Sequence, residues 1–399
     1  MSIEVRVLRT FAELYELTHV WESWPGHRDS QIDFFTTVLR GHEQAVSPCV
    51  FVIYRDGQPK AMLVGRIDYG PLFFPLAYFH FRPKARTLYL VYGALRGEDS
   101  EENCRLFLTE IQAMLRRGEA DIAYLNYLKS GSILFRVATT QPSLLARDHI
   151  RDKQPHFAAT LPTSVPAFYA RLSSKARWQA KNKQKKLERE FAGSVDIRCF
   201  TEPGEVELLL AETERVAKTS YQRGLGIGFF DNPDNRMRWA LKAEKHWLRG
   251  YILYLRGQPC AFWTADIIEG TFRSEFLGFD PAFEKHSPGN YLIFKVIESL
   301  CDDPTHSIQE IDFTTGSAQY KEMLSNASWN EELVYVFSKS PKGMMLAFLR
   351  LFTIGADHVL KSLLARTDLL KKIKKMWRSR ATDGRVQVAK SPNSRAEAA

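Results

Sequence analysis

The phrase Tyr-x-x-Gly-Gln-Pro-x-Ala occurs twice in this chain, beginning at Tyr54 and again at Tyr254. Apolar, β-forming residues precede each copy, at positions 50–53 and 251–253. Each copy therefore predicts a β-hairpin with Gly in its turn and a return strand that begins at Pro. After the second copy, a strand, a Ser-Pro-Gly helix start and another strand follow in order. We infer an internal duplication, and we expect function to lie in how the two copies differ.

Composition limits the class of protein. The chain has 399 residues, of which 45% are hydrophobic and 12% aromatic, which is enough for two or three domains with full cores. The formal net charge of +9 favours anionic partners such as nucleotide cofactors, nucleic acid or anionic lipid. The charge does not choose among these partners, and a generically basic soluble protein is the alternative.

The cysteines and the N-terminus favour a reducing compartment. The five cysteines are scattered and form no Cys-x-x-Cys pair, which argues against a zinc site and a disulfide framework. We therefore expect no metal. No apolar stretch of a signal peptide follows Met1, and no apolar run approaches the ~18 residues of a membrane span. A cytoplasmic location is the expectation.

The order of elements predicts an α/β (α+β) fold with a mixed, mostly antiparallel sheet flanked by helices in each half. A polar stretch at 147–156 is the expected junction. The predicted parts are a first domain over 1–150, a second over 156–340, a basic amphipathic helical segment over 341–380 and a disordered tail over 381–399. In the second domain, one cation-rich helix is expected to run from Ser164 to about Phe191.

The Ser287-Pro288-Gly289 sequence is the sharpest local feature. Ser is a preferred helix N-cap, Pro suits the first helical position, and Gly lets a ligand approach the backbone. A helix that starts after a strand presents free N–H groups to a phosphate. Lys285 and His286, just before it, add positive charge. An ordinary capped helix is the alternative.

A second polar cluster follows the strand at 308–313. Asp312 ends this strand, a loop with Gly316 comes next, and Tyr320 and Lys321 lie on a short predicted helix. These groups fall at the carboxyl edge of the predicted sheet, where ligands bind in open α/β sheets. Alternatively, Asp312 caps the following turn and Lys321 is a solvated surface residue.

These features together resemble the acyl-CoA N-acyltransferase (GNAT) superfamily. The shared features are the basic helix at 175–189, the hairpin at 256–261, the Ser287 loop, and Asp312 leading to Tyr320 and Lys321. More narrowly, the chain is similar to the tandem-domain acetyltransferases linked to bacterial cellulose biosynthesis, the CelD-like group. The likeness is best over about residues 160–340. It departs from the commoner superfamily loop, which is Gly-rich with a leading Arg or Gln.

The resemblance implies two tandem GNAT-like domains and a donor that is acetyl-CoA or a longer acyl-CoA. The donor would bind along the strand at 271–279, and its binding residues would be Lys285, His286, Ser287, Pro288, Gly289, Asn290 and Lys321. The acceptor would be an amine of undefined identity, in cell-envelope or exopolysaccharide metabolism. Glu275 is the candidate general base, or else pairs with Arg273 or Lys285. Tyr320 is the candidate acid for the leaving thiolate, or else a packed aromatic, and Asp312 is the candidate orienting group.

The first copy lacks the candidate donor-binding and catalytic residues of the second copy. Its corresponding helix start, at 97–102, carries four carboxylates, which suit a helix dipole but repel a pyrophosphate. The first domain is therefore expected to be non-catalytic.

The basic helix at 175–189 has three interpretations: a solvated face, a site for an anionic partner, or a membrane contact. Nucleic acid is the less favoured partner because only Trp178 lies among the cations. The segment at 341–380 suits the surface of an anionic inner membrane or packs on the body of the protein.

Two other functions compete with acyl-CoA transfer. One is an aminoacyl-tRNA-dependent transferase of the Fem type, whose fold is duplicated in a related way. No paired-helix arm of the kind that Fem-type proteins insert is evident in the sequence. The other is a non-catalytic scaffold in polysaccharide secretion that has kept the fold and lost the chemistry.

Overall fold

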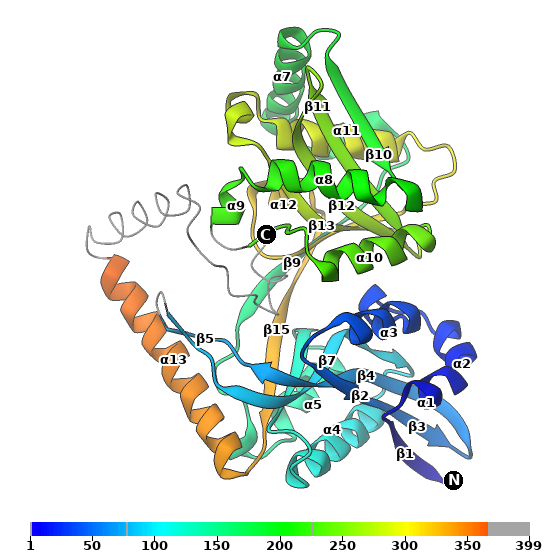
Figure 1. Ribbon diagram of the computed structural model, residues 1–399, viewed down its shortest axis with the longest axis vertical. Coiled ribbons are helices and arrows are strands. Elements are labelled where there is room, and N and C mark those ends of the chain that lie inside the picture. The colour runs from blue at the N-terminus through cyan, green and yellow to red at the C-terminus, as the bar shows by residue number, and fades with distance from the viewer. Residues whose placement is uncertain (1, 77–78, 225–226, 366–399) are drawn as a thin grey trace. The chain divides into compact units, whose positions relative to one another are not determined.

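The structure is a computed structural model that describes residues 2–76, 79–224 and 227–365 (Figure 1). The chain divides into two compact units. Among the described residues, those up to Lys153 and those at 330–365 form the first unit, and Gln154–Trp329 forms the second. The chain therefore leaves the first unit, builds the second and returns. The predicted tail at 381–399 and the basic end of the segment at 341–380 lie outside the described residues.

The first unit contains a mixed sheet with the strand order β1-β3-β4-β7-β8-β15, and β2 pairs with β4 beside this path. Only β7 and β8 are parallel among these pairs. The strands are β1 (Ile3–Leu8), β2 (Ala45–Pro48), β3 (Val50–Arg55), β4 (Gln58–Pro71), β7 (Lys84–Gly97), β8 (Ile122–Lys129) and β15 (Ala327–Phe337), with β5 (Phe74–Leu76) and β6 (Phe79–Phe81) as a separate hairpin.

Helices surround this sheet and build its core. They are α1 (Phe11–Glu16), α2 (Thr18–Ser23), η1 (Arg28–Ser30), α3 (Ile32–Gly41), α4 (Glu101–Arg116), α5 (Ile133–Thr140), η2 (Leu144–Ala146) and α13 (Pro341–Ala365). The main core joins apolar residues of β3, β4 and β8 to the buried face of α4. A smaller core joins β5, β15 and α13, with Phe74, Tyr335 and Leu346 at its centre.

The second unit repeats the same plan. Its strand order is β10-β11-β12-β13-β14-β9, and β13 with β14 is the parallel pair. The strands are β9 (Lys153–Thr160), β10 (Val195–Phe200), β11 (Leu248–Leu255), β12 (Gln258–Ile268), β13 (Thr271–Phe279) and β14 (Glu310–Thr315). The last strand of each unit is not the strand that follows that unit along the chain. β9 comes after the strands of the first unit but pairs with β14 of the second unit. β15 comes after the strands of the second unit but pairs with β8 of the first unit.

Helices cover both faces of the second sheet. They are α6 (Val165–Arg171), α7 (Ser174–Glu190), η3 (Pro203–Glu205), α8 (Val206–Ala217), α9 (Tyr221–Gly224), α10 (Pro233–Glu244), η4 (Pro281–His286), α11 (Pro288–Cys301) and α12 (Gln319–Leu324). One core packs α6, α7 and α11 on one face, and another packs α8 and α10 on the other. The predicted fold class, a mixed and mostly antiparallel α/β architecture, is confirmed.

The two Tyr-x-x-Gly-Gln-Pro-x-Ala hairpins have the same register. Tyr54 pairs with Pro59 and Tyr254 with Pro259, each directly after a β-bulge. In both turns the central residues have positive φ, Asp56 and Gly57 in one and Arg256 and Gly257 in the other. Positive φ at both central positions is the requirement of a type I′ turn, which matches the twist of the flanking strands.

The repeat extends beyond the residues that revealed it. In the outer strand of each sheet, an Arg two residues after an acid pairs with that acid and covers the Tyr of the hairpin. Arg6 lies 4.7 Å from the centre of the Tyr54 ring, and Arg198 lies 4.9 Å from that of Tyr254. The sequences of the two strands share the pattern behind these contacts, Ile3-Glu4-Val5-Arg6 in β1 and Val195-Asp196-Ile197-Arg198 in β10.

One predicted helix is two. The cation-rich helix expected from Ser164 to about Phe191 is divided into α6 and α7. Leu172 is extended, and the Ser173 side chain accepts a hydrogen bond from the Ala176 N–H, which starts a new helix. None of the helices in the described part of the chain is long and apolar enough to cross a membrane.

Candidate functional site

The two parallel strands of the second unit, β13 and β14, pair over only part of their length. The ladder between β13 and β14 holds only from Thr271 to Arg273, although β13 continues to Phe279. The remaining residues of β13 have no ladder partner in β14. This opening lies at the carboxyl edge of the sheet, next to the start of α11. In open α/β sheets such a place commonly holds a ligand.

The start of α11 is uncapped. Ser287 occupies the N-cap position but has left-handed backbone angles, φ 52° and ψ 51°, and its side chain makes no capping hydrogen bond. The prediction that Ser287 caps this helix is therefore wrong. Pro288 has no N–H, so Gly289 and Asn290 carry the first amide groups of the helix. With no capping side chain, these groups and the positive end of the helix dipole can accept an anion.

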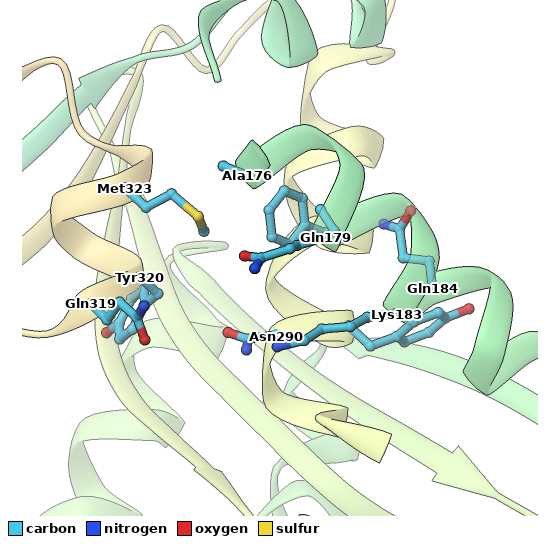
Figure 2. A pocket seen from close by; sticks show the side chains of 11 residues that line it. Ala176, Gln179, Lys183, Gln184, Asn290, Gln319, Tyr320 and Met323 are labelled. Carbon is cyan, nitrogen blue, oxygen red and sulfur yellow. The ribbon is translucent and has the colours of Figure 1, made fainter. Parts of the chain in front are cut away.

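A cavity of about 270 Å³ opens at this helix start. Its walls come from three helices of the second unit, and its lining residues are Ala176, Gln179, Ala180, Lys183, Gln184, Asn290, Tyr291, Phe294, Gln319, Tyr320 and Met323. Figure 2 shows Lys183 of α7 reaching toward Asn290 of α11, while Tyr320 and Met323 of α12 face them. The volume is at the lower limit for small-molecule sites, so it suits one part of a long ligand.

The cations of α7 are mostly exposed to solvent. Two acids of the helix are already used inside the unit: Glu188 pairs with Lys295, and Glu190 pairs with His286. Lys183, Lys185 and Lys186 have no ion-pair partner within the described residues. Of these three, Lys183 lines the cavity and brings a positive charge beside the uncapped helix.

Glu275 lies at a β-bulge of β13. Ser274 pairs with Ala265 and Phe276 with Thr264, which leaves Glu275 as the extra residue. Its side chain is 5% exposed. Glu275 Oε2 accepts hydrogen bonds from Lys242 Nζ at 2.6 Å and from Trp239 Nε1 at 3.1 Å. Its ion pair with Lys242 of α10 is a contact that the sequence did not indicate.

This pair belongs to a chain of buried charges. Lys242 also lies 3.2 Å from Asp266 of β12, and Arg273 Nη1 lies 3.6 Å from the other oxygen of Asp266. Arg273 Nε then donates to Asp312 Oδ2 at 3.1 Å. Three carboxylates thus alternate with two cations across β12, β13 and β14. Such buried charges are tolerated only when each one is paired.

His156 of β9 closes this chain. Its Nε2 lies 2.7 Å from Asp312 Oδ1, and its ring stacks on Trp329. Burial alone would raise the pKa of Asp312, but the hydrogen bond from His156 and the charges of His156 and Arg273 hold it well below the usual range. Asp312 is therefore a stable carboxylate.

Asp312 also shapes the end of β14, where the register with β9 shifts between Asp312 and Thr314. Its Oδ1 accepts the Thr314 N–H at 2.7 Å, and Thr314 has a positive φ of 65°. A β-branched residue rarely adopts this conformation, so the irregularity depends on that contact. Lys321 anchors the same strand end, since its buried Nζ donates to the Thr315 carbonyl at 2.8 Å. Burial lowers the pKa of Lys321 to about 8, against the opposing charge of Asp312.

The candidate residues lie in different parts of the second unit. Tyr320 and Asn290 line the cavity, and Pro288 and Gly289 are buried at the helix start beside it. Lys285 is exposed, and His286 is buried against Glu190. Glu275 and Asp312 belong to the buried charge chain and do not line the cavity, and Lys321 is buried at the end of β14.

Sequence reasoning missed four residues of this region: Gln179, Lys183, Lys242 and His156. The density of cations in α7 was a signal for Lys183. Lys242 and His156 gave none, because they reach Glu275 and Asp312 only through the packing of distant elements.

Comparison with known proteins identifies the region that holds the cavity and most of the charge chain. Residues 174–322 match the family of the acetyltransferase (GNAT) domain. The second unit contains a GNAT domain. This domain spans α7, the uncapped start of α11, the bulged strand β13 and the loop after β14. The match makes the unit an acyltransferase domain of the GNAT type. No curated protein matches the chain.

Solved structures extend the likeness beyond the GNAT domain. FemX superposes with a TM-score of 0.53 at 8% identity, over 85% of this chain and 98% of that chain. A conserved protein from Bacteroides thetaiotaomicron gives 0.49 at 11% identity, over 84% and 100%. A tandem GNAT protein from the clavulanic acid biosynthesis pathway gives 0.46 at 9% identity, over 84% and 99%. At these identities the likeness to FemX shows a shared fold.

Proposed function

We propose that the GNAT domain transfers an acyl group from acetyl-CoA or a longer acyl-CoA to an amine. The observation that carries this proposal is the cavity at the uncapped start of α11, where Lys183, Asn290 and Tyr320 meet. Free helix amides and a lysine suit the pyrophosphate of CoA. The unpaired edge of β13 continues from this point and suits the extended pantetheine arm. The donor would contact the loop from Lys285 to Asn290, while Lys321 would hold the neighbouring loop in place.

The reaction needs three events. The amine nitrogen attacks the thioester carbon, the tetrahedral oxyanion collapses with cleavage of the C–S bond, and the leaving thiolate takes a proton. In this proposal the Tyr320 hydroxyl supplies that proton. Glu275, which accepts a hydrogen bond from Lys242, receives the proton that the amine loses, directly or through water. Asp312 positions the end of β14 at Thr314 and does not exchange protons itself.

Donor binding can be tested by calorimetry with acetyl-CoA, longer acyl-CoAs and free CoA. Lys183→Gln should weaken acyl-CoA binding by about tenfold, because it removes one charged hydrogen bond. Lys186→Gln is the matched control, since it removes an exposed lysine of the same helix that does not line the cavity. Absence of heat and of thermal stabilisation with every CoA ester would refute the proposed donor.

The roles in catalysis need a separate measurement. Tyr320→Phe and Glu275→Gln should each lower kcat by about 10²-fold or more, the usual contribution of general acid–base catalysis, with little change in donor affinity. Wild-type rates in both variants would remove these assignments.

An aminoacyl-tRNA donor is the second candidate. The likeness of fold to FemX and the unpaired cations of α7, with the exposed Trp178 among them, favour it. Charged tRNA in the same calorimeter would separate the two donors. A protein that binds neither ligand would instead fit a non-catalytic scaffold in polysaccharide secretion.

We also propose, from the motifs described above, that the chain belongs to the CelD-like tandem branch and acts in cell-envelope or exopolysaccharide metabolism. Its first unit would then serve as a non-catalytic partner of the GNAT domain. The acidic, capped start of α4 supports this division of labour.

A further inference from the structure

Helix α13 of the first unit has two opposite faces, and one of them is fixed to the protein. Leu346 and Thr353 are fully buried on this face. Arg350 donates to both oxygens of Asp148 at 2.9–3.1 Å, and its guanidinium lies 4.0 Å from the centre of the Tyr335 ring. A buried, doubly bonded arginine holds the helix in one rotation about its axis. The outward face is therefore defined.

The outward face is an apolar stripe. Met345, Phe348, Leu351 and Phe352 follow one another at helical spacing, and their exposed fractions run from 43% to 69%. The rings of Phe348 and Phe352 stack with centres 6.3 Å apart. Single exposed apolar residues are ordinary, but a contiguous stripe with two phenylalanines marks an interaction surface.

The sequence that follows α13 indicates what covers the stripe. Residues 366–380 contain seven Lys or Arg and one Asp, interleaved with Leu, Ile, Met and Trp. Two copies of the chain that met through α13 would bring two such basic stretches close together, at a Coulomb cost. An anionic bilayer surface has the opposite charge and an apolar interior. A stripe and a basic stretch supply the two signals that stable binding to such a surface requires.

We propose that the stripe on α13 docks the protein on a membrane surface that carries anionic lipid. The stripe would enter the boundary between headgroups and acyl chains. The proposal does not depend on the reaction assigned to the GNAT domain.

Co-sedimentation with lipid vesicles tests the proposal. The full-length protein is mixed with phosphatidylcholine vesicles and with vesicles that also contain phosphatidylglycerol, at low and high salt. We expect binding to the anionic vesicles that weakens at high salt. The double variant Phe348→Glu, Phe352→Glu should bind about tenfold more weakly, because two apolar anchors are lost. A full-length variant with Lys371→Gln, Lys372→Gln and Lys374→Gln should lose the preference for anionic lipid.

The matched control is Val46→Glu with Leu208→Glu, which places the same two charges at exposed apolar positions outside α13. It should bind as the wild type does, and circular dichroism should show all variants folded. Wild-type protein that ignores anionic vesicles, or stripe variants that bind equally well, would overturn the proposal. So would sedimentation velocity that shows a dimer which only the stripe variant dissociates, since a second copy would then cover the stripe.

Discussion

The two units share one strand order but begin their equivalent helices differently. At α4 the Ser100 side chain accepts a hydrogen bond from the Asn103 N–H, and Glu101 and Glu102 fill the first turn. At α11 Ser287 provides no cap, and no acid lies in the first turn. The first unit thus satisfies its helix start with its own groups. The second leaves that start open beside a cavity with a lysine. On the function proposed above, the second unit would use this helix start for an anion, and the first unit would not.

The two units also differ in the direction in which the pKa of a buried cation is shifted. Burial would lower the pKa of Arg66 in the first unit, but Asp68 more than offsets this and raises it. The pKa of Lys321 in the second unit is lowered by burial, with only partial compensation from Asp312. The second unit therefore keeps a buried cation that a modest rise in pH can discharge. Buried groups with a pKa shifted in this way are common at functional sites.

The largest expected effect tests whether the charge chain of the second unit holds that unit together. Lys242→Met leaves Asp266 and Glu275 buried without their shared cation. We expect the free energy of unfolding of the second unit to fall by about 3–5 kcal/mol. Urea denaturation measures this loss. Lys245→Met, at an exposed position just after the same helix, should stay within about 0.5 kcal/mol of the wild type. Similar losses in the two variants would mean that the buried charge chain does not stabilise the second unit.

The next largest effect is the pH dependence of stability that the buried Lys321 should cause. Unfolding returns the pKa of Lys321 from about 8 to 10.5. Between these values the unfolded chain binds a proton that the folded chain has released, so the free energy of unfolding should rise with pH. The contribution reaches about 3 kcal/mol across the window. Lys321→Met should lack this rise relative to the wild type, whereas Lys186→Met should keep it. Parallel stability curves for wild type and Lys321→Met would show that Lys321 is not discharged in the folded state.

A third experiment exchanges the character of the two helix starts. Asn290→Glu places a carboxylate in the first turn of α11, as α4 has naturally. It should weaken acyl-CoA binding by about tenfold, since it repels the donor phosphates. The reciprocal variant, Glu101→Lys with Glu102→Lys, should leave donor affinity within about twofold. Calorimetry on both proteins gives the comparison. A large loss of CoA binding in the α4 variant would place the donor site elsewhere.

The sequence predicted what short-range chemistry determines. The turn residues of the two hairpins indicated the repeat, and the apolar strand around Asp312 indicated the sheet edge, although β14 runs on to Thr315 and does not end at Asp312. The break between α6 and α7 also had a local signal, a Ser at 173 in capping position, which the cation-rich pattern obscured. The left-handed backbone of Ser287 was not predictable, because η4 and α11 together impose it and no residue at that position requires it.

The candidate site depends more on long-range packing, so less of it could be predicted from the sequence. Tyr320 and Asn290 were identified from local motifs and both line the cavity. Glu275 was identified from its place in a strand, but its partner Lys242 comes from a helix that covers one face of the sheet. Nothing in the spacing of these two residues indicates that they meet. Local patterns place side chains on elements, and tertiary packing decides which of them share a site.

The smallest effect tests whether the hairpins are equivalent in energy as well as in register. Gly57 and Gly257 have φ of 78° and 75°, and a Cβ at either position would meet no atom within 4 Å. Gly57→Ala and Gly257→Ala should therefore each cost about 1 kcal/mol, from backbone conformation alone. Gly204→Ala is the control, because Gly204 has equal space but no positive φ, and should cost nothing. Urea denaturation of the three variants measures these costs. Unequal losses at 57 and 257 would mean that one turn has been adapted to its own unit, and the duplication would then be one of topology alone.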